Sequence, residues 1–299
     1  MECFLPEGRM PAVRQLKGEW LPALMQAYRS GQICEGYALR CSPAHDLEVS
    51  LGPFTGMIPR EEAALGISDG TAKEIAILSR VGKPICFTVT NIEERDGAVF
   101  PIFSRCAAQE AARLYLFSLP NGTILPATVT RLEPFGAFLD IGCGLVTMLG
   151  IEKISVARIT HPNQRFAPGQ SIYVLLEGKD TEKKRLLVSH KELLGTWAEN
   201  AAQFSRGMTV PGIVRGIKSY GIFVELTPNL SGLAEPQEGL HAGDHVSVYI
   251  KAILPDKQKV KLHIIDVLSS PPVPRPLVYT QTEGRIASWQ YAPVVTPSL

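Results

Sequence analysis

The sequence of 299 residues contains no hydrophobic run that approaches the roughly 18 residues of a membrane helix. Residues 1–10 carry charge and proline without the apolar stretch of a secretory signal, so we expect a cytoplasmic protein. Hydrophobic residues make up 45% of the chain and charged residues 20%, as in ordinary globular proteins. A chain of this length has room for about two or three modest domains, each with its own core.

Sequence signals of catalysis and metal binding are also missing. None of the six cysteines belongs to a C-x-x-C pair, and no Cys/His cluster has the spacing of a zinc site. The sequence has no phosphate-binding Walker loop, no Gly-x-Ser-x-Gly motif and no histidine pair at metal spacing. We therefore expect a protein that is not an enzyme, with no cofactor, no metal and no small-molecule substrate.

Charge is nearly balanced along the chain, with a net charge of +1. Residues 1–119 contain 12 Lys and Arg against 14 Asp and Glu, and residues 120–268 contain 16 against 14. A protein that binds nucleic acid through phosphate charge alone is far more basic. Any affinity for nucleic acid must therefore rely on stacking and on local basic patches.

Two segments that lie 85 residues apart repeat one pattern. Each consists of an aromatic residue, a glycine, any residue and a second aromatic residue, and each continues as alternating apolar and polar positions. The segments are Phe135-Gly136-Ala137-Phe138 and Tyr220-Gly221-Ile222-Phe223. The repeat distance is too long for a solenoid and suits a small β-domain with a linker.

Each copy predicts five short strands, the number in a small Greek-key barrel of the OB type. The strands expected in the second unit are 127–132, 138–141, 146–149, 171–176 and 185–189. Those expected in the third unit are 210–217, 222–226, 232–234, 246–253 and 260–265. A weaker copy begins near Gly31, with strands expected at 47–51, 56–59, 85–92 and 99–103 and a helical insertion around 61–78.

The sequence thus predicts a mainly β protein of three tandem OB-fold barrels joined by short helices. The divisions expected are an N-terminal helix at 1–30, a degenerate first barrel at 31–105, a linker helix at 106–119, a second barrel at 120–190, a linker helix at 191–205 and a third barrel at 206–268. Residues 269–299 are expected to form a proline-rich linker and an aromatic hairpin that docks on a barrel. Helical spacing of the apolar residues Val13, Leu16, Trp20, Leu24 and Tyr28 predicts the first helix.

The units resemble the S1 RNA-binding domain, and their tandem arrangement resembles the bacterial ribosomal protein S1 family. In the third unit the resemblance rests on Gly212-Ile213-Val214, Tyr220-Gly221-Ile222-Phe223, Gly232-Leu233, Gly243-Asp244-His245-Val246 and Lys259. In the second unit it rests on Ala127-Thr128-Val129, Phe135-Gly136-Ala137-Phe138, Gly169-Gln170-Ser171-Ile172 and Arg185. The resemblance covers roughly residues 31–268.

The resemblance implies a protein that binds single-stranded RNA, including mRNA, and acts in translation with the small ribosomal subunit. The implied RNA-binding residues are Phe135, Phe138, Arg185, Tyr220, Phe223 and Lys259. The family's histidine after the third strand is absent, because Pro59, Gly150 and Glu235 stand at that place. The first unit has His45 and Glu48 in place of the aromatic residues, and a carboxylate repels phosphate. We therefore expect the first unit to be structural or to face a protein.

Two alternatives remain open at this point. Phe138 or Phe223 would lie in a barrel core if its strand had the opposite register. Independently, Arg185 and Lys259 would be ordinary solvated turn charges, because residues 183–185 and 257–261 are locally basic. Phe135 and Tyr220 precede a glycine at a strand junction, a place that favours exposure. The alternative function is a protein-binding adaptor with little RNA affinity of its own, which the near-neutral charge and the altered first unit favour.

Overall fold

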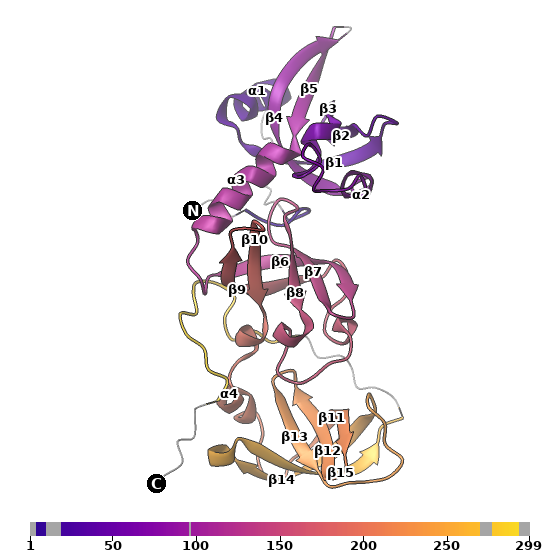
Figure 1. Cartoon of the computed structure of the whole chain (residues 1–299), viewed down its shortest axis with the longest axis vertical. Helices are drawn as coiled ribbons and strands as arrows, with labels where there is room; N and C mark the ends of the chain where they lie inside the picture. Colours follow the sequence, from indigo (N-terminus) through magenta and orange to yellow (C-terminus); the bar gives the residue numbers. More distant parts are fainter. Residues whose placement is uncertain (1–3, 10–18, 96, 270–276, 293–299) are drawn as a thin grey trace. The chain divides into compact units, whose positions relative to one another are not determined.

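The computed structural model describes residues 4–9, 19–95, 97–269 and 277–292. In these residues fifteen strands form two closed five-stranded barrels and, between them in the sequence, one five-stranded sheet (Figure 1). The chain divides into two compact units. One holds the residues up to Leu119 together with Pro126–Thr130 and Leu139–Thr147, and the other holds Pro120–Leu125, Arg131–Phe138 and the residues from Met148 on.

The first barrel is closed in the order β1-β2-β3-β5-β4. Its strands are β1 (Ile33–Cys41), β2 (Leu47–Leu51), β3 (Phe54–Ile58), β4 (Pro84–Arg95) and β5 (Ala98–Ser104). Phe87 and Phe103 are fully buried in its core, with ring centroids 4.3 Å apart. Helix α1 (Trp20–Ser30) adds Leu24 and Ala27 to that core and ends at Gly31, whose left-handed backbone suits glycine. The predicted insertion contains only the short helices η2 (Arg60–Glu62) and α2 (Ile75–Leu78), with turns between them.

The second and third barrels repeat the same strand order. The second has β6 (Ile124–Glu133), β7 (Gly136–Asp140), β8 (Val146–Gly150), β9 (Ser171–Asp180) and β10 (Arg185–Ser189) in the order β10-β9-β6-β7-β8. The third is closed and has β11 (Thr209–Lys218), β12 (Gly221–Thr227), β13 (Leu230–Ala234), β14 (His245–Leu254) and β15 (Lys259–Val267). Short helices lie between the barrels: α3 (Arg105–Ser118), then η5 (Lys191–Leu194) and α4 (Trp197–Ala201). The predicted fold class, three tandem OB-type barrels joined by short helices, is confirmed.

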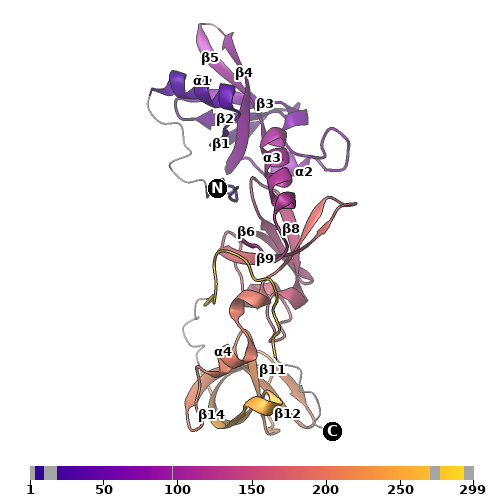
Figure 2. The ribbon, with the colours of Figure 1, turned by 90° about the vertical axis from the view of Figure 1, so that its left-hand side faces the viewer.

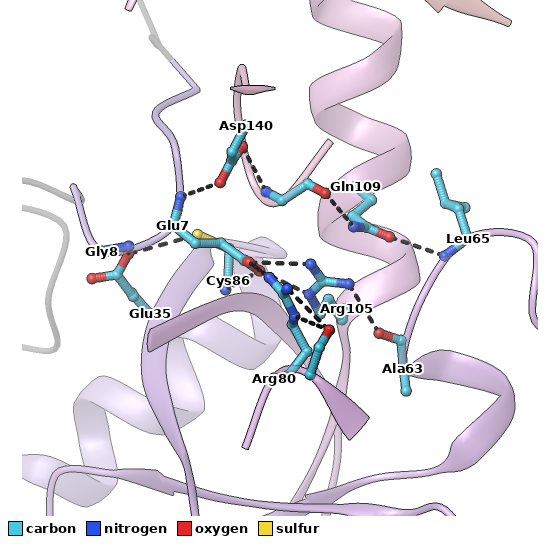
Figure 3. Close-up of polar contacts among 12 residues, drawn as sticks. Glu7, Gly8, Glu35, Ala63, Leu65, Arg80, Cys86, Arg105, Gln109 and Asp140 are labelled. Atoms are coloured by element: carbon cyan, nitrogen blue, oxygen red, sulfur yellow. Dashed lines mark hydrogen bonds and ion pairs between the residues drawn. The ribbon is translucent and has the colours of Figure 1, made fainter. Parts of the chain in front are cut away.

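A buried ionic cluster in the compact unit that contains the first barrel holds the N-terminal residues 4–9 (Figure 3). The Glu7 carboxylate accepts hydrogen bonds from Arg105 Nε at 2.8 Å and Arg80 Nη1 at 3.2 Å, and from the main-chain N–H of Cys86 at 3.2 Å. The side chains of Glu7 and Arg105 are 5% and 3% exposed. Burial acts to raise the pKa of Glu7, but the guanidinium groups of Arg105 and Arg80 bring it below its ordinary value. Each buried charge is therefore compensated by the other.

The same cluster reaches the turn between β7 and β8. Oxygens of Asp140 accept the main-chain N–H groups of Glu7 at 2.8 Å, Gly142 at 2.9 Å and Gly144 at 3.1 Å. Burial and the nearby Glu7 charge raise the pKa of Asp140 to about 7, while the N–H groups and Arg105 oppose that rise. Gln109 of α3 completes the contacts by donating to the Gly144 carbonyl at 3.3 Å (Figure 3).

The C-terminal segment does not form the predicted hairpin within its described residues, 277–292. Its main chain bonds to barrel residues instead: Ile124 N–H donates to the Gly284 carbonyl at 3.0 Å, Ile286 N–H to the Gly122 carbonyl at 2.9 Å, and Thr280 N–H to the Leu193 carbonyl at 2.9 Å. Partners far away in the sequence thus satisfy the groups that a hairpin would have paired. The predicted docking of this segment on a barrel is confirmed, and both ribbon views show it beside β9 and α4 (Figures 1 and 2). The predicted proline-rich linker at 270–276, and Val13 and Leu16 of the predicted first helix, lie outside the described residues.

A buried histidine receives the C-terminal segment. His190 is fully buried, with Nδ1 2.7 Å from the Ile154 carbonyl oxygen and Nε2 3.1 Å from the Tyr279 hydroxyl. The Phe166 and Tyr279 rings stand perpendicular to the imidazole, at centroid distances of 5.0 and 5.5 Å. Burial lowers the pKa of His190 to about 4, so the ring is neutral at physiological pH.

We expect Glu7→Gln to lower the free energy of unfolding by about 3–5 kcal/mol, because it leaves the buried Arg105 charge without a counter-charge. The matched control is Glu110→Gln, which removes a half-buried pair with Arg113 on α3 and should change stability by less than about 1 kcal/mol. Urea unfolding of both variants measures the difference. Equal effects in the two variants would show that the Glu7 cluster does not stabilise the fold.

We expect His190 to make the protein less stable as the pH falls from about 6.5 to about 4. In this range the unfolded chain takes up a proton at His190 before the folded chain does, so protonation favours unfolding, by about 3 kcal/mol at most. His190→Gln should remove this part of the pH dependence, measured as the unfolding free energy across that range. His241→Gln, at a side chain that is 83% exposed, is the control and should leave the dependence unchanged.

Candidate nucleic-acid interface

The two aromatic pairs have the same geometry in their two barrels. The rings of Phe135 and Phe138 have centroids 6.2 Å apart and planes at 84°, and those of Tyr220 and Phe223 are 6.2 Å apart at 88°. Phe135 is 55% exposed and Tyr220 65%, which confirms the expected exposure of these two rings. The second and third barrels therefore each present one exposed flat ring and a second ring perpendicular to it.

Phe138 and Phe223 are partly buried and do not fill the barrel cores. Their neighbours on the strand fill the cores instead: Ala137 and Leu139 on β7, and Ile222 and Val224 on β12, are fully buried. Because successive side chains of a strand point to opposite faces, this leaves the second ring of each pair on the outer face. The alternative register, with these rings inside, is wrong.

The glycine of each motif lets its strand approach the next one closely. A Cβ atom at Gly136 would lie 2.3 Å from the Leu149 carbonyl oxygen, and one at Gly221 would lie 2.7 Å from the Ala234 carbonyl oxygen. Both distances are far below van der Waals contact, and the obstacle is main chain, which cannot rotate away. Glycine is therefore required between the two rings for β7 to pair with β8 and β12 with β13.

The predicted basic residues open the last strand of each barrel. Arg185 lies opposite Asp180 in the β9–β10 hairpin, and Lys259 lies opposite Leu254 in the β14–β15 hairpin. Both are exposed, and Arg185 Nη2 is 3.4 Å from Asp180 Oδ2. A hydrogen bond from Lys183 N–H and the Arg185 charge lower the pKa of Asp180. Within the described residues neither cation lies over an aromatic ring, so the structure places them at the end of the face and not against the rings.

Arg131 on β6 belongs to this face, although the sequence motif does not include it. Its guanidinium lies over the Phe138 ring at 4.6 Å from the centroid, and its Nε is 3.2 Å from Glu133 Oε1. A guanidinium plane beside a ring extends the surface on which a base can stack. The repeat distance of 85 residues makes Gly216 of the third barrel the counterpart of Arg131. Because Gly216 pairs with Phe223, the repeat indicates that Arg131 lies beside Phe138.

Further residues extend the face across the third barrel. Phe223 is in register with Leu233 on β13, and Leu233 is in register with Lys261 on β15. Residues in register on adjacent strands point to the same face, and both Leu233 and Lys261 are exposed. Glu235, at the place of the family histidine, pairs with Lys251 at 2.9 Å and lies 3.9 Å from His263 Nδ1. Polar and apolar residues alternate along β15 in the sequence. This alternation indicates that Lys261 and His263 lie on the outer face of the barrel.

The first barrel lacks the aromatic pair at the corresponding place. Glu48 on β2 pairs with Met57 on β3, as Phe223 pairs with Leu233, and its carboxylate is 2.7 Å from Arg40 Nε. His45 lies 3.2 Å from Glu74. Arg40, Glu48, Met57 and Phe100 line a shallow hollow on this surface. A structural or protein-facing role of the first barrel stays a prediction.

None of the helices in the described part of the chain is long and apolar enough to cross a membrane. The same residues contain no group of three or more His, Cys, Asp or Glu side chains that could hold a metal ion. The five described cysteines are free thiols.

Residues 118–191 match the family model described as the S1 RNA binding domain. This range contains the second of the three OB-type barrels. The chain is similar to small ribosomal subunit protein bS1 over about half of its length. It is 36% identical over 171 residues to that of Leuconostoc lactis and 31% identical over 161 residues to that of Staphylococcus aureus strain COL.

These alignments cover 52% and 50% of this chain, but only 40% and 41% of the two relatives. The chain therefore spans about two fifths of the length of the bS1 proteins that it matches. A solved multidomain protein with nucleic acid binding domains from Streptococcus pneumoniae is also similar, with 14% identity, 79% of this chain and 73% of that chain covered, and a TM-score of 0.27.

We expect Gly136→Ala to destabilise the second barrel by about 1–3 kcal/mol, because the new methyl group would clash with the Leu149 carbonyl oxygen. Gly178→Ala on β9 of the same barrel is the matched control, since its Cβ would meet only Leu187 Cδ1 at 3.7 Å. Thermal unfolding of the two variants measures the effect. A Gly136→Ala variant as stable as the control would show that the close approach is not needed.

Proposed function

We propose that this protein binds single-stranded RNA, mRNA in particular, through the outer faces of its second and third barrels. The observation that carries the proposal is the duplicated pair of perpendicular, solvent-exposed rings, Phe135 with Phe138 and Tyr220 with Phe223. The match of residues 118–191 to the S1 RNA binding domain supports it. The proposed role is that of a cytoplasmic binding protein in translation, associated with the small ribosomal subunit, and not that of an enzyme; the relatives named bS1 support this role.

Stacking supplies most of the proposed affinity. An unpaired base that stacks on an aromatic side chain contributes roughly 1–3 kcal/mol, with little dependence on sequence because every base has a π-face. Arg185 and Lys259 at the ends of the faces, with Arg131 over Phe138, then neutralise phosphates. Two such barrels on one chain raise the overall affinity through effective concentration. The arrangement suits holding an unstructured strand without reading its sequence.

We expect Phe135→Ala and Tyr220→Ala each to weaken the binding of a fluorescently labelled oligo(U) by roughly five- to a hundred-fold, the equivalent of one lost base stack. Fluorescence anisotropy measures the affinity. Tyr28→Ala, at an exposed aromatic residue of α1, is the control and should bind as the unaltered protein does. Equal affinity in all three variants would contradict binding by these rings.

The second candidate function is a protein-binding adaptor, which the Glu48–Arg40 pair on the first barrel and the near-neutral net charge favour. Oligo(U) binding, measured together with co-sedimentation with small ribosomal subunits in a lysate gradient, distinguishes the two functions. An RNA-binding protein loses oligo(U) binding when both exposed rings are replaced by alanine. An adaptor has no oligo(U) binding to lose and sediments with the subunit whether or not the rings are present.

A further inference from the structure

The second and third barrels can be compared position by position on their last two strands. In both hairpins the register shifts at the same place: between Leu187 and Val188 against β9, and between Lys261 and Leu262 against β14. The turns agree as well, since Lys184 and Gln258 both have a left-handed backbone. The common bulge makes Leu187 the counterpart of Lys261, Arg185 that of Lys259, and Glu177 that of Lys251.

At these positions the two faces differ in charge. At the position of Lys261 the second barrel has the exposed Leu187, and at the position of Lys251 it has Glu177. The apolar character of the second face continues on β8, where Met148, like Leu187, is 46% exposed. The third face thus combines rings with a cationic strand, and the second face combines rings with an apolar one.

The cations on the compared strands also differ in whether a carboxylate already holds them. In the second barrel Arg131 pairs with Glu133, Arg185 with Asp180, and Lys153 with Glu177. In the third barrel Lys251 shares Glu235 with His263. Among the described residues no carboxylate lies within ion-pair distance of Lys259 or Lys261. A cation without a carboxylate partner can bind phosphate without first breaking an ion pair.

This inference rests on the proposed function. We propose that the two faces divide the contacts to one RNA strand unequally: the third barrel supplies most of the phosphate contacts, through Lys261 and Lys259, and the second barrel, whose arginines are paired with carboxylates, mainly holds bases against its apolar face. Lys261, in register with Leu233 and hence with Phe223, places its ammonium on the same face as the stacking rings. A base on Phe223 and the phosphate beside it are then bound together. The salt dependence of RNA binding comes mainly from the third barrel.

A reciprocal exchange in the full chain tests the division. Lys261→Leu gives the third face the residue of the second, and Leu187→Lys does the reverse; both positions are exposed, so the fold should tolerate either change. The affinity for labelled oligo(U) is measured by anisotropy over a range of salt concentrations. Each phosphate contact to a single strand contributes about 0.7 to the slope of log affinity against log salt. We expect the slope to become shallower by about 0.7 in Lys261→Leu and steeper by about 0.7 in Leu187→Lys.

The control is Lys83→Leu, at an exposed lysine of the first barrel, which should leave the slope unchanged. Circular dichroism and the thermal midpoint verify that each variant is folded. An unchanged slope in Lys261→Leu, while Phe135→Ala and Tyr220→Ala still weaken binding, would overturn the division and leave the proposed function standing. A slope that Lys83→Leu lowers as much as Lys261→Leu would also overturn it. A protein that binds no oligo(U) at any salt concentration would overturn both.

Discussion

A five-stranded barrel has one small interior, and each strand can fill it with only every second residue. The rest of this structure depends on that constraint. On β7 and β12 the interior takes Ala137 and Leu139, and Ile222 and Val224, so the aromatic residue between each pair must face outward. The outward direction of Phe138 and Phe223 is therefore a consequence of core packing. Glycine at the start of each strand allows the close approach to β8 and β13.

Net charge says little about which surface of this protein attracts phosphate, because many of its cations already have partners. Arg105 and Arg80 are held by Glu7, and Arg165 and Arg215 share the buried carboxylate of Glu225, with Nη2 of Arg165 2.6 Å away and Nε of Arg215 2.5 Å away. Buried pairs of this kind organise the polypeptide but contribute no field that a ligand can use. Cations that remain exposed and without a carboxylate partner among the described residues, such as Lys259 and Lys261 on β15, can act on a ligand.

The C-terminal segment shows how a short extended stretch can be held without secondary structure of its own. It contacts the second barrel through Gly284 and Ile286, and Tyr291 lies against α4 and the third barrel. The Tyr291 carbonyl accepts the Trp197 N–H at 2.8 Å, and the Tyr291 hydroxyl donates to the Asn229 carbonyl at 2.5 Å. Asn229 is itself fully buried and donates to the carbonyls of Lys191 and Gly195, both at 2.7 Å. A single segment thus satisfies polar groups of both barrels and of the turn between them.

The strands, the three-barrel fold and the exposure of Phe135 and Tyr220 could be predicted from the sequence. The strands follow from alternation, the barrels from a repeat that is visible along the chain, and the exposure from a place before a glycine at a strand junction. Only the tertiary structure decided which residues meet across strands: Arg131 over Phe138, Lys261 beside Leu233, Glu7 beside Arg105, and the C-terminal segment on the barrels instead of on itself. Those contacts depend on strand register and on packing, in all but the first case between residues tens to more than a hundred positions apart. Local patterns carry no information about such partners, since many pairings satisfy the same alternation.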